Sequence, residues 1–246
     1  MKILFVHQNF PGQFRHVAPA LAQNPDDDVR ALTMRLDVPS PWQGVKLNPY
    51  SIEGIPKPNG LSWLSDFEVK TVRAEACYRA ALNLFNTGFV PDVIVAHPGW
   101  GESLYLKTVW PDAKLLMYAE FYYHMTGLDV GFDPEQTPSD PSSLHRFSLK
   151  NINNLLHFQM ADAGISPTKW QASTFPPEFQ EKITVIHDGI DTERLRPDPM
   201  VSVRLQDGRT LTRSDEVITF VSRDLEPYRG YHIFMRVLPE LLKRRP

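Results

Sequence analysis

Short runs of apolar residues alternate, from Ile3 to Ile186, with longer stretches in which apolar side chains recur every three or four positions. The short runs are typical of strands buried in a parallel sheet, and the longer stretches are typical of helices that cover such a sheet. We therefore predict an α/β fold, a Rossmann-like parallel sheet with helices on both faces. The predicted strands are 3–6, 29–34, 50–52, 92–96, 114–119, 163–166 and 183–186, and the clearest helices are 63–86 and 145–160.

The pattern changes toward the end of the chain. Residues 217–221 predict one more strand and 230–243 one more helix, but two such elements cannot bury their own apolar faces. We therefore expect a truncated second α/β unit, although the strand could instead join the edge of the first sheet. The expected division is an N-terminal domain over 1–196, a connector over 197–216 that holds two prolines and a glycine, and the second unit over 217–246.

Composition narrows the class of protein. The 246 residues carry a net charge of −3, which counts against a nucleic-acid binder because such proteins present a basic surface. A single cysteine, Cys77, excludes an intramolecular disulfide and any zinc site built from several cysteines. Neither a signal-peptide core nor a membrane-spanning run is apparent in the pattern. We expect a cytoplasmic protein without a transmembrane segment, for which peripheral membrane association stays open.

The turn after the first predicted strand reads HQNFPGQFRH, with Gly12 just before a predicted helix. Free N–H groups at a helix start can bind a phosphate, and glycine lets the backbone approach it. A glycine needed only for turn geometry explains the residue equally well. One glycine is not a GxGxxG or Walker pattern, which counts against a nicotinamide dehydrogenase and a nucleoside triphosphatase.

Candidate chemistry also follows two later strands. The segment HPGWGES places His97, Trp100 and Glu102 at the carboxyl end of a strand, where open α/β sheets bind ligands. Trp100 has a flat face suited to a sugar ring, and His97 and Glu102 could reach sugar hydroxyls. The segment YAEFYYH places Glu120 in a similar position, as a hydroxyl acceptor or general base. Each has a structural alternative: a buried histidine with satisfied nitrogens, or a carboxylate that anchors a loop.

These histidines and carboxylates, together with His124, match no known spacing of metal ligands, and we expect no metal site. Near the end of the chain, SRDLEPYRGYHIF brings Arg223 and Arg229 to a strand end and a helix start, an arrangement suited to a diphosphate. The alternative is surface charge, with Arg223 and Arg229 paired to Asp224 and Glu226.

In this order, the segments resemble a family 4 glycosyltransferase of the group 1 type, which adopts the two-domain GT-B fold. The resemblance spans the chain and is carried by HQNFPGQFRHVAPAL, DVIVAHPGWGES, KLLMYAEFYYH, ADAGISPTKWQ, KITVIHDGIDTERLRP and VSRDLEPYRGYHIFMRVLP. It implies a retaining transfer of a sugar from a nucleotide-sugar donor to a hydroxyl of a carbohydrate acceptor, without metal or cofactor. The N-terminal domain would hold the acceptor and the C-terminal domain the donor.

The resemblance also assigns roles. Gly12 would approach the donor phosphates, His97 would contact the donor sugar, and Arg223 and Arg229 would bind the diphosphate, although the family more often has lysine at the second position. It assigns nothing to Glu102 or Glu120. The Glu-x7-Glu signature of the donor domain is absent from the sequence, so we expect a fragment with little activity of its own.

Two alternatives remain from the sequence. One is a non-catalytic module of Rossmann type that binds a glycan or a nucleotide. The other is a GT-B-like nucleotide-sugar epimerase, which would release nucleotide without an acceptor. An exposed strand edge in the last segment would also allow this chain to dimerise.

Overall fold

The computed structural model describes residues 1–52, 54, 64–128, 130–136 and 144–245. Its contacts divide the chain into two compact units, Met1–Gly189 and Ile190–Pro246, and each unit is described by itself. The division falls earlier in the chain than the domain end expected at residue 196.

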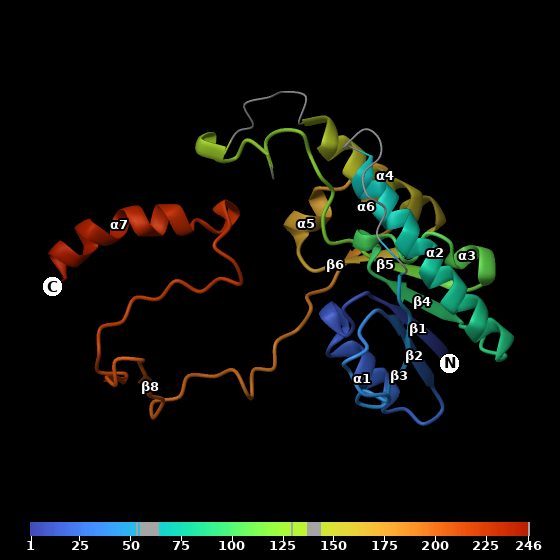
Figure 1. Ribbon diagram of the computed structural model, residues 1–246, viewed down its shortest axis with the longest axis horizontal. Coiled ribbons are helices and arrows are strands. Elements are labelled where there is room, and N and C mark those ends of the chain that lie inside the picture. Colours follow the sequence, from blue (N-terminus) through green and yellow to red (C-terminus); the bar gives the residue numbers. More distant parts are fainter. Residues whose placement is uncertain (53, 55–63, 129, 137–143, 246) are drawn as a thin grey trace. The chain divides into compact units, whose positions relative to one another are not determined.

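The first unit is built on one parallel sheet of seven strands (Figure 1). Every neighbouring pair of strands in it is parallel, in the order β3-β2-β1-β4-β5-β6-β7. The strands are β1 Lys2–Val6, β2 Asp28–Thr33, β3 Lys46–Pro49, β4 Val93–Ala96, β5 Lys114–Tyr118, β6 Ala163–Ser166 and β7 Ile183–Val185.

Helices cover both faces of this sheet, as predicted (Figure 1). Side chains of β1 alternate between the two faces: Ile3 and Phe5 pack with the core on the side of α1, and Leu4 and Val6 pack with the core beneath α2. The helical elements of the first unit are η1 Gly12–Phe14, α1 Val17–Ala22, α2 Ser65–Asn86, η2 Pro98–Trp100, α3 Leu106–Val109, η3 Pro134–Gln136, α4 His145–Met160, α5 Lys169–Ser173 and α6 Pro177–Gln180.

The predicted fold class is therefore confirmed. Within this sheet, the strand whose position differs most from the prediction is the edge strand β3. The strand expected at 50–52 lies at Lys46–Pro49, and only the N–H of Tyr50 continues the pairing, donating to the carbonyl of Thr33 at 2.9 Å. Pairing with β2 fixes this register, and the apolar pattern of a short edge segment does not. The predicted helix start at Trp63 lies outside the described residues.

The second unit contains a short antiparallel hairpin and a helix. Its elements are β8 Val203–Arg204, β9 Thr210–Leu211, η5 Pro227–Arg229 and α7 Tyr231–Arg244. The predicted helix is thus present, whereas the strand predicted at 217–221 is wrong, because the structure assigns none there. A strand is held by ladder hydrogen bonds, and within the described residues this segment pairs neither with the first sheet nor with the hairpin.

Across the part of the chain that the structure describes, no helix combines the length and the apolar character needed to cross a membrane.

Candidate functional site

The sheet reverses its direction of growth between β1 and β4. From β1 the chain moves outward to β2 and β3, then returns to β4 on the other side and continues to β5. The loops that leave the carboxyl ends of β1 and β4 therefore run to opposite sides, and the crevice at such a point is the usual ligand position in open α/β sheets. His7 follows β1, and His97 follows β4.

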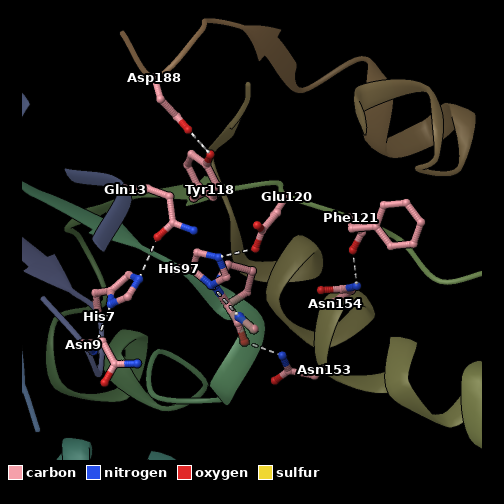
Figure 2. A network of polar contacts seen from close by, with 12 residues as sticks. His7, Asn9, Gln13, His97, Tyr118, Glu120, Phe121, Asn153, Asn154 and Asp188 are labelled. Carbon is pink, nitrogen blue, oxygen red and sulfur yellow. Dashed lines mark hydrogen bonds and ion pairs between the residues drawn. The ribbon is translucent and has the colours of Figure 1, made fainter. Parts of the chain in front are cut away.

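His7 is a buried member of this site that the sequence reasoning did not single out. Its Nδ1 accepts the N–H of Asn9 at 3.0 Å, so that in the neutral ring Nε2–H donates to Oε1 of Gln13 at 2.8 Å (Figure 2). Gly12 has φ +47°, and a Cβ there would lie 2.3 Å from Nε2 of His7. The imidazole therefore explains a glycine at position 12, whose expected approach to donor phosphates stays a prediction.

His97 and Glu120 form the central contact of the site. Nδ1 of His97 accepts the N–H of Gly99 at 3.1 Å, so Nε2–H donates to Oε2 of Glu120 at 2.8 Å (Figure 2). His97 is 3% exposed, whereas the side chain of Glu120 is 47% exposed. Both ring nitrogens of His97 have protein partners, and the carboxylate is the group that reaches the surface.

Aromatic rings enclose the imidazole of His97. Trp100 lies 4.5 Å from it and 4.8 Å from the ring of His7, and Tyr118 stacks on it at 5.3 Å, all measured between ring centroids. The hydroxyl of Tyr118 donates to Asp188, with 2.9 Å to each carboxylate oxygen, which ties the end of β5 to the segment after β7. Since Trp100 contacts both histidines, its expected stacking on a sugar stays a prediction.

Three asparagines of α4 hold the loops of the site. Asn151 donates to the carbonyl of Tyr123 at 2.6 Å and accepts its N–H at 2.9 Å. Asn154 donates to the carbonyl of Phe121 at 3.1 Å, and Asn153 donates to the carbonyl of Pro98. The loop after β4 and the loop after β5 are thereby fixed to the same helix.

One turn further along α4, His157 is fully buried. Its Nδ1–H donates to the carbonyl of Asn153 at 2.7 Å, and its Nε2 accepts the hydroxyl of Ser103 at 2.7 Å. Sequence reasoning missed this helix as part of the site. The available signal was the segment NINNLLH, because asparagine is a poor helix former whose side chain readily bonds to backbone groups.

Glu102 lies away from the crevice, in the interior beneath α2. It is 0% exposed, and its carboxylate lies near the hydroxyl of Tyr50 and the guanidinium of Arg73. Burial raises the pKa of Glu102 to about 7, and the guanidinium of Arg73 opposes the shift. The role of Glu102 as a sugar ligand stays a prediction. A fully buried carboxylate is poorly placed for that role.

The electrostatics of the two buried histidines lead to a prediction for nuclear magnetic resonance. Burial lowers the pKa of His7 and of His157 to about 4, and the neighbouring His97 contributes in both cases. We therefore expect the ring protons of His7 and His157 to keep constant chemical shifts between pH 8 and pH 5.5. His157→Gln would assign one signal; a titration midpoint near 6.5 for either ring would contradict the prediction.

In the second unit, both predicted phosphate-binding arginines have carboxylate partners. Arg223 pairs with Asp224 at 3.0 Å, and Arg229 pairs with Glu226 at 3.3 Å. These are the pairs of the surface-charge alternative. Diphosphate binding by the two arginines stays a prediction, and a ligand would compete with these carboxylates. Within the described ranges, no three histidine, cysteine or acidic side chains are grouped closely enough to hold a metal ion.

Comparison with known proteins gives one match by family. The family model described as "Glycosyl transferase family 4 group" matches residues 25–195, which include β4, β5 and α4 with the site loops. No curated protein matches the sequence.

Solved structures with a similar fold are distant. Sucrose-phosphate synthase from Thermosynechococcus elongatus is 11% identical over 79% of this chain and 93% of its own, with a TM-score of 0.48. Os79 from O. sativa is 12% identical over 80% of this chain and 55% of its own, with a TM-score of 0.49. UDP-GlcNAc 2-epimerase from Neisseria meningitidis is 12% identical over 75% of this chain, with a TM-score of 0.39, and the match spans 45% of the epimerase chain. Identities this low do not transfer function.

Proposed function

Because the chain belongs to the glycosyl transferase family 4 group, we propose that it serves a retaining transfer of a sugar from a nucleotide-sugar donor to an acceptor hydroxyl. In this proposal the first unit holds a carbohydrate acceptor, and the protein acts in the cytoplasm. The observation that carries the proposal is the hydrogen bond from His97 to a half-exposed Glu120 at the point where the sheet reverses direction.

Glu120 is suited to bind a sugar hydroxyl. A carboxylate accepts several hydrogen bonds, and the side chain of Glu120 is 47% exposed beside its 2.8 Å bond with His97. His97 is itself fixed by the N–H of Gly99 and by the rings of Trp100 and Tyr118, so it orients the carboxylate. Because both nitrogens of His97 are bonded, we propose that Glu120 makes the hydroxyl contact and that His97 acts as its positioning residue.

The proposed chemistry needs neither a protein nucleophile nor a metal. The bond between the anomeric carbon and the donor phosphate breaks, and the electron pair leaves with the phosphate oxygen. The acceptor hydroxyl attacks the same face of the sugar, and its proton passes to that oxygen. We propose that Arg223 and Arg229 stabilise the negative charge on the leaving group, for which preorganised cationic donors are effective.

Acceptor dependence tests this function. The protein expressed from its gene is incubated with nucleotide sugars of different bases and with mixed carbohydrate acceptors, and released nucleotide and new glycosides are measured. We expect nucleotide release only with an acceptor, and a glycoside that keeps the anomeric configuration of the donor. Release without acceptor would indicate an epimerase, and binding without turnover would indicate a binding module. The sequence-based expectation of little activity by the 246-residue chain alone is tested in the same assay.

Glu120→Gln should lower kcat/KM about tenfold or more, because a hydrogen bond to a charged acceptor contributes roughly 1.5–3 kcal/mol. The substitution keeps the shape of the side chain and removes its charge. Glu181→Gln, at an exposed carboxylate after α6, is the matched control and should leave kcat/KM unchanged. Equal kcat/KM for Glu120→Gln and the unchanged protein would remove Glu120 from the proposed site.

A further inference from the structure

A pocket in the first unit extends from the His97–Glu120 contact toward α4. Its lining includes Glu120, His97, Tyr123, Lys70 and Lys150, contributed by the loops after β4 and β5 and by α2 and α4. Figure 2 shows Glu120 between His97 and the main chain of Phe121, which Asn154 of α4 holds. The carboxylate that we propose to bind a sugar hydroxyl therefore shares one pocket with two lysines.

The two lysines differ in how their charge is balanced. The ammonium of Lys70 lies 2.9 Å from Asp66, one turn earlier in α2, and that pair is neutral as a whole. Lys150 has no carboxylate partner within the described ranges. Its Nζ lies 4.8 Å from the ring centroid of Tyr123 and 5.6 Å from that of Phe147, contacts that favour an ammonium but do not neutralise it.

The pocket therefore presents a carboxylate, Glu120, that accepts hydrogen bonds, and an ammonium, Lys150, that pairs with no carboxylate of the described residues. We propose that the acceptor substrate is a polyhydroxylated molecule with one anionic group, a carboxylate or a phosphate, which pairs with Lys150 while a hydroxyl binds Glu120. This inference rests on the proposed function, because it names the class of acceptor for the same site.

A neutral sugar would leave Lys150 without an ionic partner and would place one more hydroxyl near an ammonium that water already solvates. An anion on the same molecule forms a charge-assisted hydrogen bond, about twice as strong as a neutral one. The partial burial of Lys150 and the rings of Tyr123 and Phe147 beside it reduce solvent screening of that contact. The pocket should therefore discriminate by charge as well as by hydroxyl pattern.

Direct binding tests the inference without activity. Glucose, glucuronate and glucose 6-phosphate are titrated into the 246-residue chain by calorimetry or by ligand-observed nuclear magnetic resonance. We expect at least one anionic sugar to bind about tenfold more tightly than glucose, with an affinity that falls as salt rises. Lys150→Gln should abolish the preference, and Lys150→Arg should keep most of it. Lys169→Gln, at an exposed lysine of α5 outside this pocket, is the matched control and should retain it.

Equal binding of glucose and both anions, no binding of either anion, or a preference that survives Lys150→Gln would each overturn the inference. Which anion binds more tightly assigns the group as carboxylate or phosphate. The proposed function fails separately. If the pocket prefers anionic sugars but the protein expressed from its gene shows no acceptor-dependent transfer, the transferase proposal is refuted and the binding inference stands. If the protein transfers sugar to neutral acceptors and Lys150→Gln does not change that transfer, the transferase proposal stands and the inference about an anionic acceptor is refuted.

Discussion

Replacing Gly101 with alanine should lower the free energy of unfolding by about 3 kcal/mol. Gly101 follows η2 with φ +97°, a left-handed conformation that costs an alanine roughly 1–2 kcal/mol. A Cβ at this position would also lie 2.5 Å from the main-chain oxygen of Lys70 in α2. Because that contact is with backbone, relief requires the site loop to move away from α2, and overpacking of this kind costs about 1–3 kcal/mol more.

Gly88 offers a matched control for Gly101→Ala. It also has a positive φ, +82°, but a Cβ there would meet nothing within 4 Å. Gly88→Ala should therefore show only the conformational cost, about 1–2 kcal/mol. Urea unfolding of both variants separates the two contributions. Equal losses of stability would show that the close approach of the loop to Lys70 contributes nothing.

The second large effect concerns Glu102 and pH. The folded protein keeps the Glu102 proton up to about pH 7, whereas the unfolded chain releases it near pH 4.5. The folded state thus binds more protons in this window, and stability that is present below pH 4.5 is lost as pH rises through 7. The loss should amount to about 3 kcal/mol, since each pKa unit corresponds to roughly 1.4 kcal/mol.

Comparing Glu102→Gln with the unchanged protein isolates this contribution. His7 and His157 change stability with pH in the opposite direction, but they are present in both proteins and their effect cancels. Their lowered pKa values mean that stability is lost as pH falls from 6.5 toward 4. Urea unfolding at several pH values therefore compares Glu102→Gln with the unchanged protein. The difference between them should grow by about 3 kcal/mol in favour of the variant from pH 4.5 to pH 8. Glu75→Gln, at an exposed carboxylate of α2, should give a flat difference, and a flat difference for Glu102→Gln would refute the prediction.

The elements of the first unit were largely predictable because their signals are local. The apolar run 93–96 is continuous, as expected for a strand with both faces covered, and it forms the central strand β4. The helix predicted at 145–160 has the bounds of α4. Thr168 caps α5 by accepting the N–H of Gln171 at 3.1 Å, a contact between residues three positions apart. The segment 217–221 has a similar apolar run and forms no strand, because a strand also requires a pairing partner.

The candidate site was predictable only in part. Placing His97 and Glu120 after two neighbouring strands brought them to one edge of the sheet, and the structure joins them by a hydrogen bond. Glu102 also lies in a loop after a strand, beyond the short helix η2 that follows β4, yet it points into the interior beneath α2. Nothing in the residue types separates these two carboxylates. The difference comes from the turn at Gly101, where the loop packs against the backbone of α2.

Local pattern was sufficient for the order of strands and helices, and for the loops that would carry polar side chains, because periodicity and turn residues act over a few neighbouring positions. The bonding and exposure of those side chains depended on segments far apart in the chain. Asn153 reaches Pro98 and His157 reaches Ser103 across more than fifty residues, and Lys150 enters the same pocket as Glu120. Packing of α2 and α4 on the sheet creates these contacts, and no short-range pattern encodes which side chains such packing brings together.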